Sequence, residues 1–448
     1  MATHDLTLLQ MLPEGDVAGA LTPERLLHTL LAMQTSAAPL RQICRHERVH
    51  AIARTCRALL EPNSERMQRL VTECALESGW SEAMVRQTTT DFLRLCDEPG
   101  LTTLLADELG PGVHERTFVP SAQRATQRTL VPPPAVLHIL ASTVPTAPIE
   151  AIALTLAAGV PCVIRTSREG RVAARFFLQT LRDHAPELAA HAAVVTWDPS
   201  NEGFLRTLDE IRPHIVVHGS DETLQKIRRG LHEPVEVSGF GHRFSFGFIA
   251  PDLALTKGQL RDLSERVALD ASLFEGGGCM SPQSIFVIPP PAQPTLAEDL
   301  AEALATYAFP KVAKTLPRGM PPVEIAAEQM QQAGVAAFRG RAFTSEHGNA
   351  LLWNDLALRS SPGWRHLHVE RIRSLEDLLE LLTPWAHNLS TAGVYTGAPT
   401  TGELGMRLAA AGVRRICPVG RMQRPVLLRA HDGLPRVRSF FRCCDIEG

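Results

Sequence analysis

The sequence predicts an α/β protein in which a helical region precedes two stretches of alternating strands and helices. Residues 22 to about 110 have helical periodicity and little strand character. Residues from 121 onward alternate short apolar runs with amphipathic segments, a pattern typical of parallel sheets with crossover helices. A second alternating stretch begins near residue 251. Because 448 residues exceed the roughly 250–300 at which one core stops growing, we expect several structural units.

The helical region is indicated by its capping signals and its apolar face. Thr22 is placed to cap a helix that has Pro23 at its first position. Leu26 and Leu30 then recur on one face, and Ser81 is placed to cap a later helix. We assign residues 1–120 to this N-terminal helical region.

The first alternating stretch, residues 121–250, predicts a Rossmann-like domain. Strand-like runs at 135–142, 160–167, 192–199 and 213–220 are separated by helical segments at 149–159, 171–185 and 201–211. Open parallel sheets bind ligands beyond the carboxyl ends of their strands. The polar residues expected at those ends include Ser142 and Thr143, Arg165 and Ser167, and Gly219 and Ser220.

The second stretch, residues 251–415, predicts another α/β domain. Helical segments are expected at 255–271, 296–310, 322–334 and 375–386, and strands at 283–290 and 366–372. Residues 416–448 form a short C-terminal segment.

Composition argues against several classes of protein. The net charge of −3, with scattered arginines, does not indicate a nucleic-acid partner. No apolar run of about 18 residues occurs, so we expect no membrane insertion. The N-terminus lacks the basic region of a signal peptide, and the nine cysteines have no metal-binding spacing. We therefore expect a soluble cytoplasmic protein with reduced thiols and no metal.

The strongest candidate site is Cys279, which follows three consecutive glycines in FEGGGCMSPQ. Glycines allow a substrate to approach the sulfur closely, and backbone N–H groups around the cysteine could stabilise an oxyanion. A thiolate is both a strong nucleophile and a good leaving group, which suits acyl transfer. The alternative is an incidental buried cysteine in a tight loop.

Weaker signals surround this motif in the sequence. His242, in GFGHRF, could activate a thiol or move a proton, or could merely bond a turn. Gly219 and Ser220 stand where a strand opens a helix, so they could contact a phosphate, although Ser220 could equally be an N-cap. Arg165, with Ser167, could bind a 2′-phosphate or remain a solvated surface arginine. There is no G-x-G-x-x-G motif here.

These motifs, in this order, resemble the LuxC family of acyl-CoA reductases, which belongs to the aldehyde dehydrogenase superfamily. The resemblance covers nearly the whole chain and rests on LHILASTVPTAPIEAIALTLAAG, GSDETLQKIR, GFGHRFSFGF, GCMSPQ, NLSTAGV and ELGMRLAAAGVRRICPVGRMQRP. It implies an aldehyde dehydrogenase-like fold, with the C-terminal segment returning to the cofactor domain.

The resemblance also implies a chemistry and its partners. Cys279 would accept an acyl group from coenzyme A or a carrier, and NADPH, with NADH as the alternative, would reduce the acyl-enzyme to an aldehyde. The family's type member supplies aldehyde for bacterial luminescence, and members often work with an acyl-activating synthetase. A homo-oligomer is expected by resemblance alone.

The sequence departs from the superfamily pattern at three places. Ser142 and Thr143 stand where an oxyanion-binding asparagine is usual, and Arg165 replaces a lysine. His242 lies roughly where oxidising members have a glutamate base, and the absence of that base fits a reductase.

Two rival functions remain, and the missing glutamate base argues against an oxidiser. One is an aldehyde oxidiser or an acyl-phosphate reductase on the same fold. The other is a non-catalytic binding partner in an acyl-transfer complex, which the intact Cys279 motif disfavours.

Overall fold

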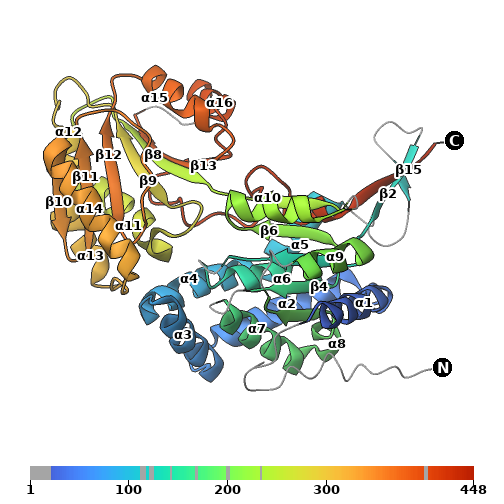
Figure 1. Ribbon diagram of the computed structural model, residues 1–448. Helices are drawn as coiled ribbons and strands as arrows, with labels where there is room; N and C mark the ends of the chain where they lie inside the picture. Colours follow the sequence, from blue (N-terminus) through green and yellow to red (C-terminus); the bar gives the residue numbers. More distant parts are fainter. Residues whose placement is uncertain are drawn as a thin grey trace, which may run out of the picture. The chain divides into compact units, whose positions relative to one another are not determined.

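The computed structural model describes residues 22–110, 118–120, 126–141, 144–166, 170–197, 202–232, 235–397 and 402–447. These residues form two compact units (Figure 1). Unit 1 comprises residues 1–77, 89–241 and 426–448, and unit 2 comprises residues 78–88 and 242–425.

Unit 1 is built on a five-stranded parallel sheet with the strand order β5-β4-β3-β6-β7. Counted from the first strand of the sheet, this order is 3-2-1-4-5, the arrangement of a Rossmann sheet. The strands are β3 (Val136–Ile139), β4 (Cys162–Arg165), β5 (Ala192–Val195), β6 (His214–His218) and β7 (Val237–Phe240). Strand order reverses between β3 and β6, which is where open α/β sheets bind ligands.

Helices cover this sheet because its strands are apolar on both sides. Leu26 and Leu30 of α1 share one core with β3, β6, α9 and α10, whereas α2, α6 and α7 pack together elsewhere in the unit. The helices of unit 1 are α1 (Pro23–Leu40), α2 (Arg45–Leu60), α3 (Glu65–Ser78), α5 (Glu98–Leu109), α6 (Ala147–Ala157), α7 (Arg171–His184), α8 (Pro186–Ala189), α9 (Glu202–Ile211) and α10 (Asp221–Gly230), together with the later part of α4 (Glu82–Leu95).

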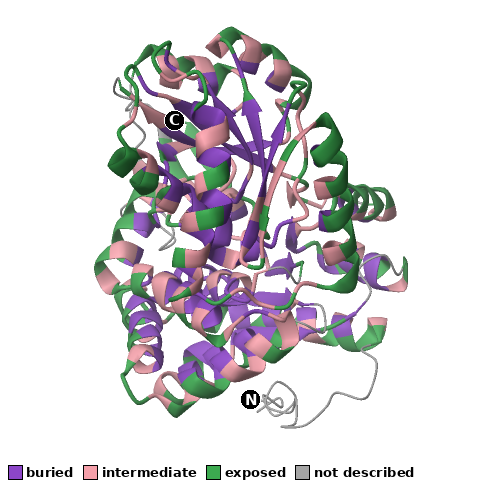
Figure 2. Ribbon diagram, turned by 90° about the vertical axis from the view of Figure 1, so that its left-hand side faces the viewer, coloured by how far each residue is buried: buried purple, intermediate pink, exposed green. Residues whose placement is uncertain are grey.

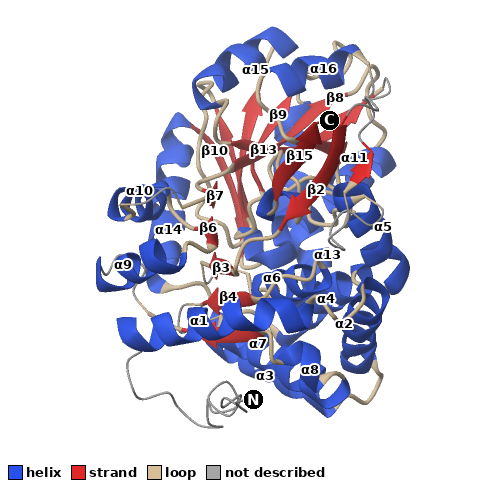
Figure 3. Cartoon of the chain, turned by 90° about the vertical axis from the view of Figure 1, so that its right-hand side faces the viewer, coloured by secondary structure: helices blue, strands red, loops and turns tan. Residues whose placement is uncertain are grey.

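The C-terminal segment of unit 1 forms an antiparallel ribbon. Strand β2 (Thr126–Val131) pairs with both β1 (Val119–Pro120) and β15 (Arg442–Glu447), as Figures 1 and 3 show for β2 and β15. The carboxylate of Glu108 accepts backbone N–H bonds from Arg436, Val437 and Arg438, just before the short helix η5 (Arg438–Phe440). These bonds attach the segment to the end of α5.

Unit 2 contains a seven-stranded sheet with the order β10-β11-β12-β9-β8-β13-β14, and its central strands are buried (Figure 2). All pairs are parallel except β10 with β11. The strands are β8 (Phe244–Ala250), β9 (Pro282–Val287), β10 (Gly340–Ser345), β11 (Gly348–Trp353), β12 (His366–Arg371), β13 (Leu389–Thr396) and β14 (Arg415–Pro418).

Most helical elements of unit 2 overlap the expected segments, whereas η2 and α16 were not expected. The helical elements are α11 (Lys257–Ser272), η2 (Leu273–Gly276), α12 (Leu296–Ala303), η3 (Leu304–Ala308), α13 (Phe309–Ala313), α14 (Val323–Arg339), α15 (Leu375–Leu382), η4 (Thr383–Trp385) and α16 (Glu403–Ala410). Phe244, Phe246 and Phe248 of β8 form a core with Phe286 of β9 and with side chains of α15 and α16.

The observed units differ from the expected ranges at three points. Residues 78–88 of the expected helical region belong to unit 2, and so do residues 242–250, which we placed in the Rossmann-like domain. The physical reason for the second difference is that β8 pairs with β9 and β13, inside the second sheet. Residues 416–425 also remain in unit 2, so the returning segment begins at Val426.

Candidate active site

Cys279 lies in the turn between η2 and β9, and it is exposed. The turn is closed by a hydrogen bond from Ser281 N to Gly278 O, 2.9 Å long. Strands β8 and β9 are parallel neighbours with Ser245 opposite Pro282. His242 precedes Ser245 by three residues, and Cys279 precedes Pro282 by three residues. Both residues therefore lie before the amino ends of two neighbouring parallel strands. His242 and Cys279, the two candidates from the sequence, thus precede adjacent strands. His242 is exposed, as is Cys279.

Two side chains fix the backbone around Cys279. Ser245 Oγ donates to the carbonyl of Cys279 (2.7 Å) and accepts from the N–H of Thr391 on β13 (3.0 Å). Gln423 Nε2 donates to Ser281 Oγ. A Cβ on Gly278 would lie 3.2 Å from Gln423 Oε1, so a glycine suits this close approach. The nucleophile's main chain is therefore held from β8 and from the segment after β14.

The segment that carries Gln423 is itself held by a buried carboxylate. Asp270, near the end of α11, accepts N–H bonds from Gly420 (2.6 Å) and Met422 (3.0 Å). Burial raises the pKa of Asp270 to about 7, although these N–H groups and Arg415 favour its charged form. Arg415 donates to Met422 O at 2.7 Å and lies 3.7 Å from the sulfur of Met280.

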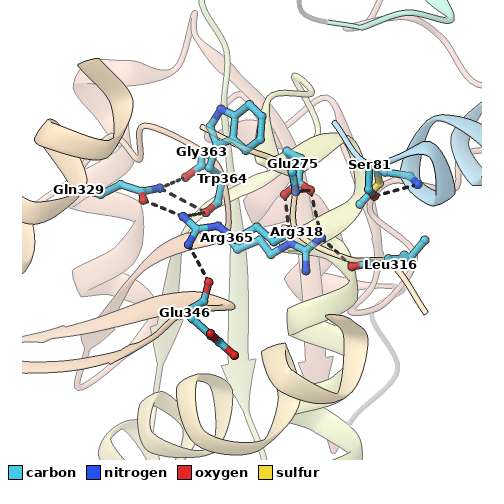
Figure 4. A network of polar contacts seen from close by, with 11 residues as sticks. Ser81, Glu275, Leu316, Arg318, Gln329, Glu346, Gly363, Trp364 and Arg365 are labelled. Carbon is cyan, nitrogen blue, oxygen red and sulfur yellow. Dashed lines mark hydrogen bonds and ion pairs between the residues drawn. The ribbon is translucent and has the colours of Figure 1, made fainter. Parts of the chain in front are cut away.

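On the other side of the turn lies a buried ion pair, drawn in Figure 4. Glu275 Oε2 accepts from Arg365 Nε, and Glu275 Oε1 accepts from Arg365 Nη2, both at 3.0 Å. Glu275 Oε1 also accepts from Gly319 N at 2.9 Å, and Arg365 Nη2 donates to Leu316 O at 2.9 Å. Both side chains are almost completely buried. Glu275 is therefore fully engaged and unsuited to act as a base toward Cys279.

The backbone around this ion pair is unusual. Phe274 and Glu275 have positive φ angles of 58° and 48°, and Trp364 and Arg365 have 54° and 59°. Such angles are costly for non-glycine residues and persist only where the surroundings impose them. Trp364 N donates to Glu275 O, so the two strained pairs are tied together directly. A Cβ on Gly276 would lie 3.2 Å from the Cα of Gly363, which explains a glycine there.

In unit 1, Gly219 and Ser220 follow β6 at the point where strand order reverses. Ser220 is the N-cap of α10, with its Oγ accepting from Thr223 N at 3.2 Å. Asp221 and Glu222 occupy the first turn of the helix. These two carboxylates already complement the positive end of the helix, and they would repel a phosphate.

Arg165 lies at the carboxyl end of β4 and is partly buried. Its Nε donates to the carbonyl of Trp197 (2.7 Å), and its Nη1 lies 3.5 Å from the carbonyl of Leu140. The guanidinium thus bridges the ends of β3 and β5, a role that neither of our two interpretations included. Ser142, Thr143 and Ser167 lie outside the described residues.

An aromatic cluster that we did not foresee lies at the same end of the unit 1 sheet. His218, at the end of β6, stacks on Phe240 at the end of β7, with ring centroids 4.7 Å apart. His431 lies 4.4 Å from Phe240 and 5.1 Å from His218. Burial lowers the pKa of His431 to about 3, so its ring is neutral near pH 7. The HDG sequence that contains His431 was visible, but nothing local linked it to β6.

The polar contacts that hold the Cys279 turn were also missed. Glu275 and Gln423 lie in quoted segments but were given no role, Asp270 lies in none, and the hydrogen-bond partners of these three residues are between 44 and 152 positions away in the chain. Within the described residues, no cluster of three or more His, Cys, Asp or Glu side chains is arranged to bind a metal. No described helix is long and apolar enough to cross a membrane.

The fold of the chain is aldehyde dehydrogenase-like, as comparison with solved structures shows. An oxidoreductase from Marinobacter aquaeolei is similar, with a TM-score of 0.73, 14% identity and coverage of 95% of this chain and 91% of that chain. A putative aldehyde dehydrogenase, PutA, from Anabaena variabilis has a TM-score of 0.69, 14% identity and coverage of 95% and 93%. An NAD-dependent benzaldehyde dehydrogenase from Corynebacterium glutamicum has a TM-score of 0.69, 14% identity and coverage of 96% and 91%.

The particular family follows from the sequence comparison. The model of the family "Acyl-CoA reductase (LuxC)" matches residues 42–443, so the chain belongs to the LuxC acyl-CoA reductase family. Comparison with curated proteins finds no match. The expected aldehyde dehydrogenase-like α/β fold and the LuxC resemblance are thereby confirmed.

Proposed function

We propose that this protein reduces an acyl thioester, donated by coenzyme A or by a carrier or partner protein, to an aldehyde through an acyl-enzyme on Cys279. The observation that supports the proposal most directly is the exposed thiol on a fixed turn. The Cys279 carbonyl is held by Ser245, and the next residues are held by Gln423. A nucleophile that is fixed at the start of an interior strand is what acyl transfer requires.

The first step forms a bond between the Cys279 sulfur and the acyl carbon and breaks the bond between that carbon and the donor sulfur. The Cys279 sulfur attacks the acyl carbonyl, the tetrahedral oxyanion collapses, and the donor thiolate leaves with the acyl group now on Cys279. The N–H of Cys279 is a candidate oxyanion donor. His242, which leads into the neighbouring strand, is a candidate for moving the proton. Ser142 and Thr143 remain candidate oxyanion neighbours.

The second step needs a reductant, which we propose to be NADPH, with NADH as the alternative. When bound, the reduced nicotinamide supplies a hydride to the acyl carbon, after which Cys279 leaves as a thiolate and the aldehyde is released. Unit 1 fits such a group. The reversal of strand order lies between β3 and β6, and the His218, Phe240 and His431 rings form a partly exposed aromatic cluster there.

The residues after β6 indicate which part of the cofactor they could contact. Gly219 follows β6 where the strand order reverses, and its lack of a side chain allows the cofactor to approach the main chain closely. The first-turn carboxylates of α10 favour contacts to Gly219 and Ser220 through hydroxyls rather than through a phosphate. Arg165, which bonds to the carbonyls that follow β3 and β5, and Ser167 stay candidate contacts of a 2′-phosphate.

The oxidising alternative lacks support at Cys279. Hydrolysis of an acyl-enzyme needs a base for water. Glu275 is the glutamate nearest to Cys279 in the sequence, and both of its oxygens are bound to Arg365 and Gly319. Because Glu275 is bound in this way, we expect the acyl-enzyme on Cys279 to be reduced by hydride rather than hydrolysed by water.

The deciding experiment is acylation of the full-length protein by a series of acyl-CoA thioesters without cofactor. We expect a mass increase on the peptide containing Cys279, and its loss with aldehyde release when NADPH is added. Cys279→Ser should give no adduct, whereas Cys44→Ser, at another exposed cysteine, should react normally. A Cys279→Ser protein that still made aldehyde at the native rate would disprove the covalent mechanism. Aldehyde offered with NADP, and acyl phosphate offered with NADPH, test the rival activities.

A further inference from the structure

Helix α14 of unit 2 is 17 residues long, and it presents an apolar face to solvent. Only Gln329 and Ala336 of these residues are buried: Ala336 packs with Leu351 and Trp353 of β11, and Gln329 donates to the carbonyls of Gly363 and Trp364. A helix on a globular protein usually buries a continuous stripe of its surface, and helices gain most of their stability from that packing. The solvent side of α14 should therefore be polar, but it carries large apolar side chains beside its charged and amide residues.

The exposed stripe runs along the full length of the helix. Its large members are Val323 (80% exposed), Met330 (76%) and Phe338 (94%), and Met320 (81%), which precedes the helix, is exposed as well. Ala327 and Gly334 complete the stripe at intervals of three and four residues, which places these five residues of α14 on one face: Val323, Ala327, Met330, Gly334 and Phe338. A Cβ on Gly334 would meet nothing within 4 Å. Contiguous exposed patches of this kind mark interaction sites.

The order of residues in this stripe is complementary to itself. In an antiparallel pair of α14 helices related by a twofold axis between Met330 and Gln331, Val323 faces Phe338 of the second copy. Ala327 then faces Gly334, so small residues meet and the helices can approach closely. A twofold axis requires each patch to be complementary to its own copy.

The charges beside the stripe select the same orientation. Glu324 and Arg339 lie on one flank of α14, at its two ends, and both are exposed. In the antiparallel pair Glu324 of each copy lies next to Arg339 of the other, whereas a parallel pair would oppose like charges. Arg339 is 3.6 Å from Asp355 in its own chain, an exposed ion pair that leaves it free to exchange partners. Antiparallel helix dipoles add to this preference.

We propose that the α14 face binds a second copy of this chain through antiparallel helix pairing. Unit 2 is extended at this place by β10, which is an edge strand of the seven-stranded sheet (Figure 1). This pairing is independent of the acyl chemistry proposed above.

The test measures association of the full-length protein by sedimentation velocity across micromolar concentrations. We expect the wild type to contain this dimer, alone or within a larger assembly. Met330→Glu should raise the dissociation constant at least about thirtyfold, the effect of losing a central contact. Leu253→Glu, at an equally exposed residue elsewhere in unit 2 (79%), is the matched control and should leave association unchanged. A monomeric wild type, or undiminished association of Met330→Glu, would overturn the proposal.

Charge reversal and crosslinking test the orientation. Glu324→Arg and Arg339→Glu should each weaken association, and the double variant should restore it. Ala327→Cys with Gly334→Cys should form an intermolecular disulfide, because seven helical residues span about 10.5 Å within one chain. That distance exceeds the roughly 7 Å a disulfide tolerates between Cα atoms. Failure of the restored double variant, or crosslinking no greater than in either single cysteine variant, would contradict the antiparallel arrangement.

Discussion

Replacing Glu275 by glutamine tests how the Cys279 turn is held. Glutamine keeps the shape of the side chain but removes the charge that both Arg365 bonds use. Arg365 is fully buried, so it would become an uncompensated buried cation. Removing one partner of such a pair costs about 3–5 kcal/mol. The amide also presents a donor where Arg365 or Gly319 already donates, which disturbs the strained backbone at Glu275 and Arg365.

Two assays separate stability from positioning. Urea unfolding at pH 7 should show the loss of free energy directly. Single-turnover acylation of Cys279, measured well below the unfolding midpoint, should slow by about tenfold to a hundredfold because the turn is displaced. Arg365→Lys keeps the charge but not the two parallel bonds, so it should have an intermediate effect on both.

A control is offered by Glu370, which pairs with Arg359 in the same unit. Burial raises the pKa of Glu370 to about 8, so it is largely protonated at pH 7, and Glu370→Gln should cost about 1 kcal/mol or less. The reasoning is refuted if Glu275→Gln unfolds like wild type, or if its acylation rate is unchanged despite a large loss of stability.

Three further predictions concern Gln423 and the titrating groups. Gln423→Ala should slow acylation of Cys279. Gln423→Asn should also be slower than wild type, because the shorter side chain does not bring its amide to Ser281. Burial lowers the pKa values of five histidines to about 3 or 4, so their neutral forms stabilise the fold above pH 6.5 and this stability is lost as pH falls; they are His138, His191, His366, His368 and His431. Burial also lowers the pKa of His214, whereas Asp270 and Glu370 have raised pKa values and act in the opposite sense. Because the histidines outnumber these two acids, unfolding takes up protons as pH falls from 6.5 to 5, and urea titrations should show stability falling over that range. Unchanged stability between pH 6.5 and 5 would contradict this balance. In the alkaline direction the stability from Glu370 is lost as pH rises through about 8, and Glu370→Gln should flatten that decline.

Local patterns in the sequence determined the elements that form unit 1. Its parallel strands are short apolar runs because both faces are covered, and Thr22 and Ser81 cap helices as expected. Ser220 is an N-cap, which was the alternative to a cofactor contact. The glycine-rich turn identified Cys279, since close approach and nucleophilicity depend on neighbouring residue types. The collinear motifs also determined the family, which the comparison confirmed.

Only the tertiary structure decided which distant residues hold the turn. Glu275 meets Arg365, and Gln423 meets Ser281, because the sheet of unit 2 brings the ends of non-consecutive strands together. The sequence also did not predict that Phe338 is exposed, because α14 has the composition of an ordinary packed helix. A side chain's partner depends on strand order, whereas its helix or strand depends on its neighbours in the chain. This difference in range is why the sequence predicted the nucleophile but not its supports.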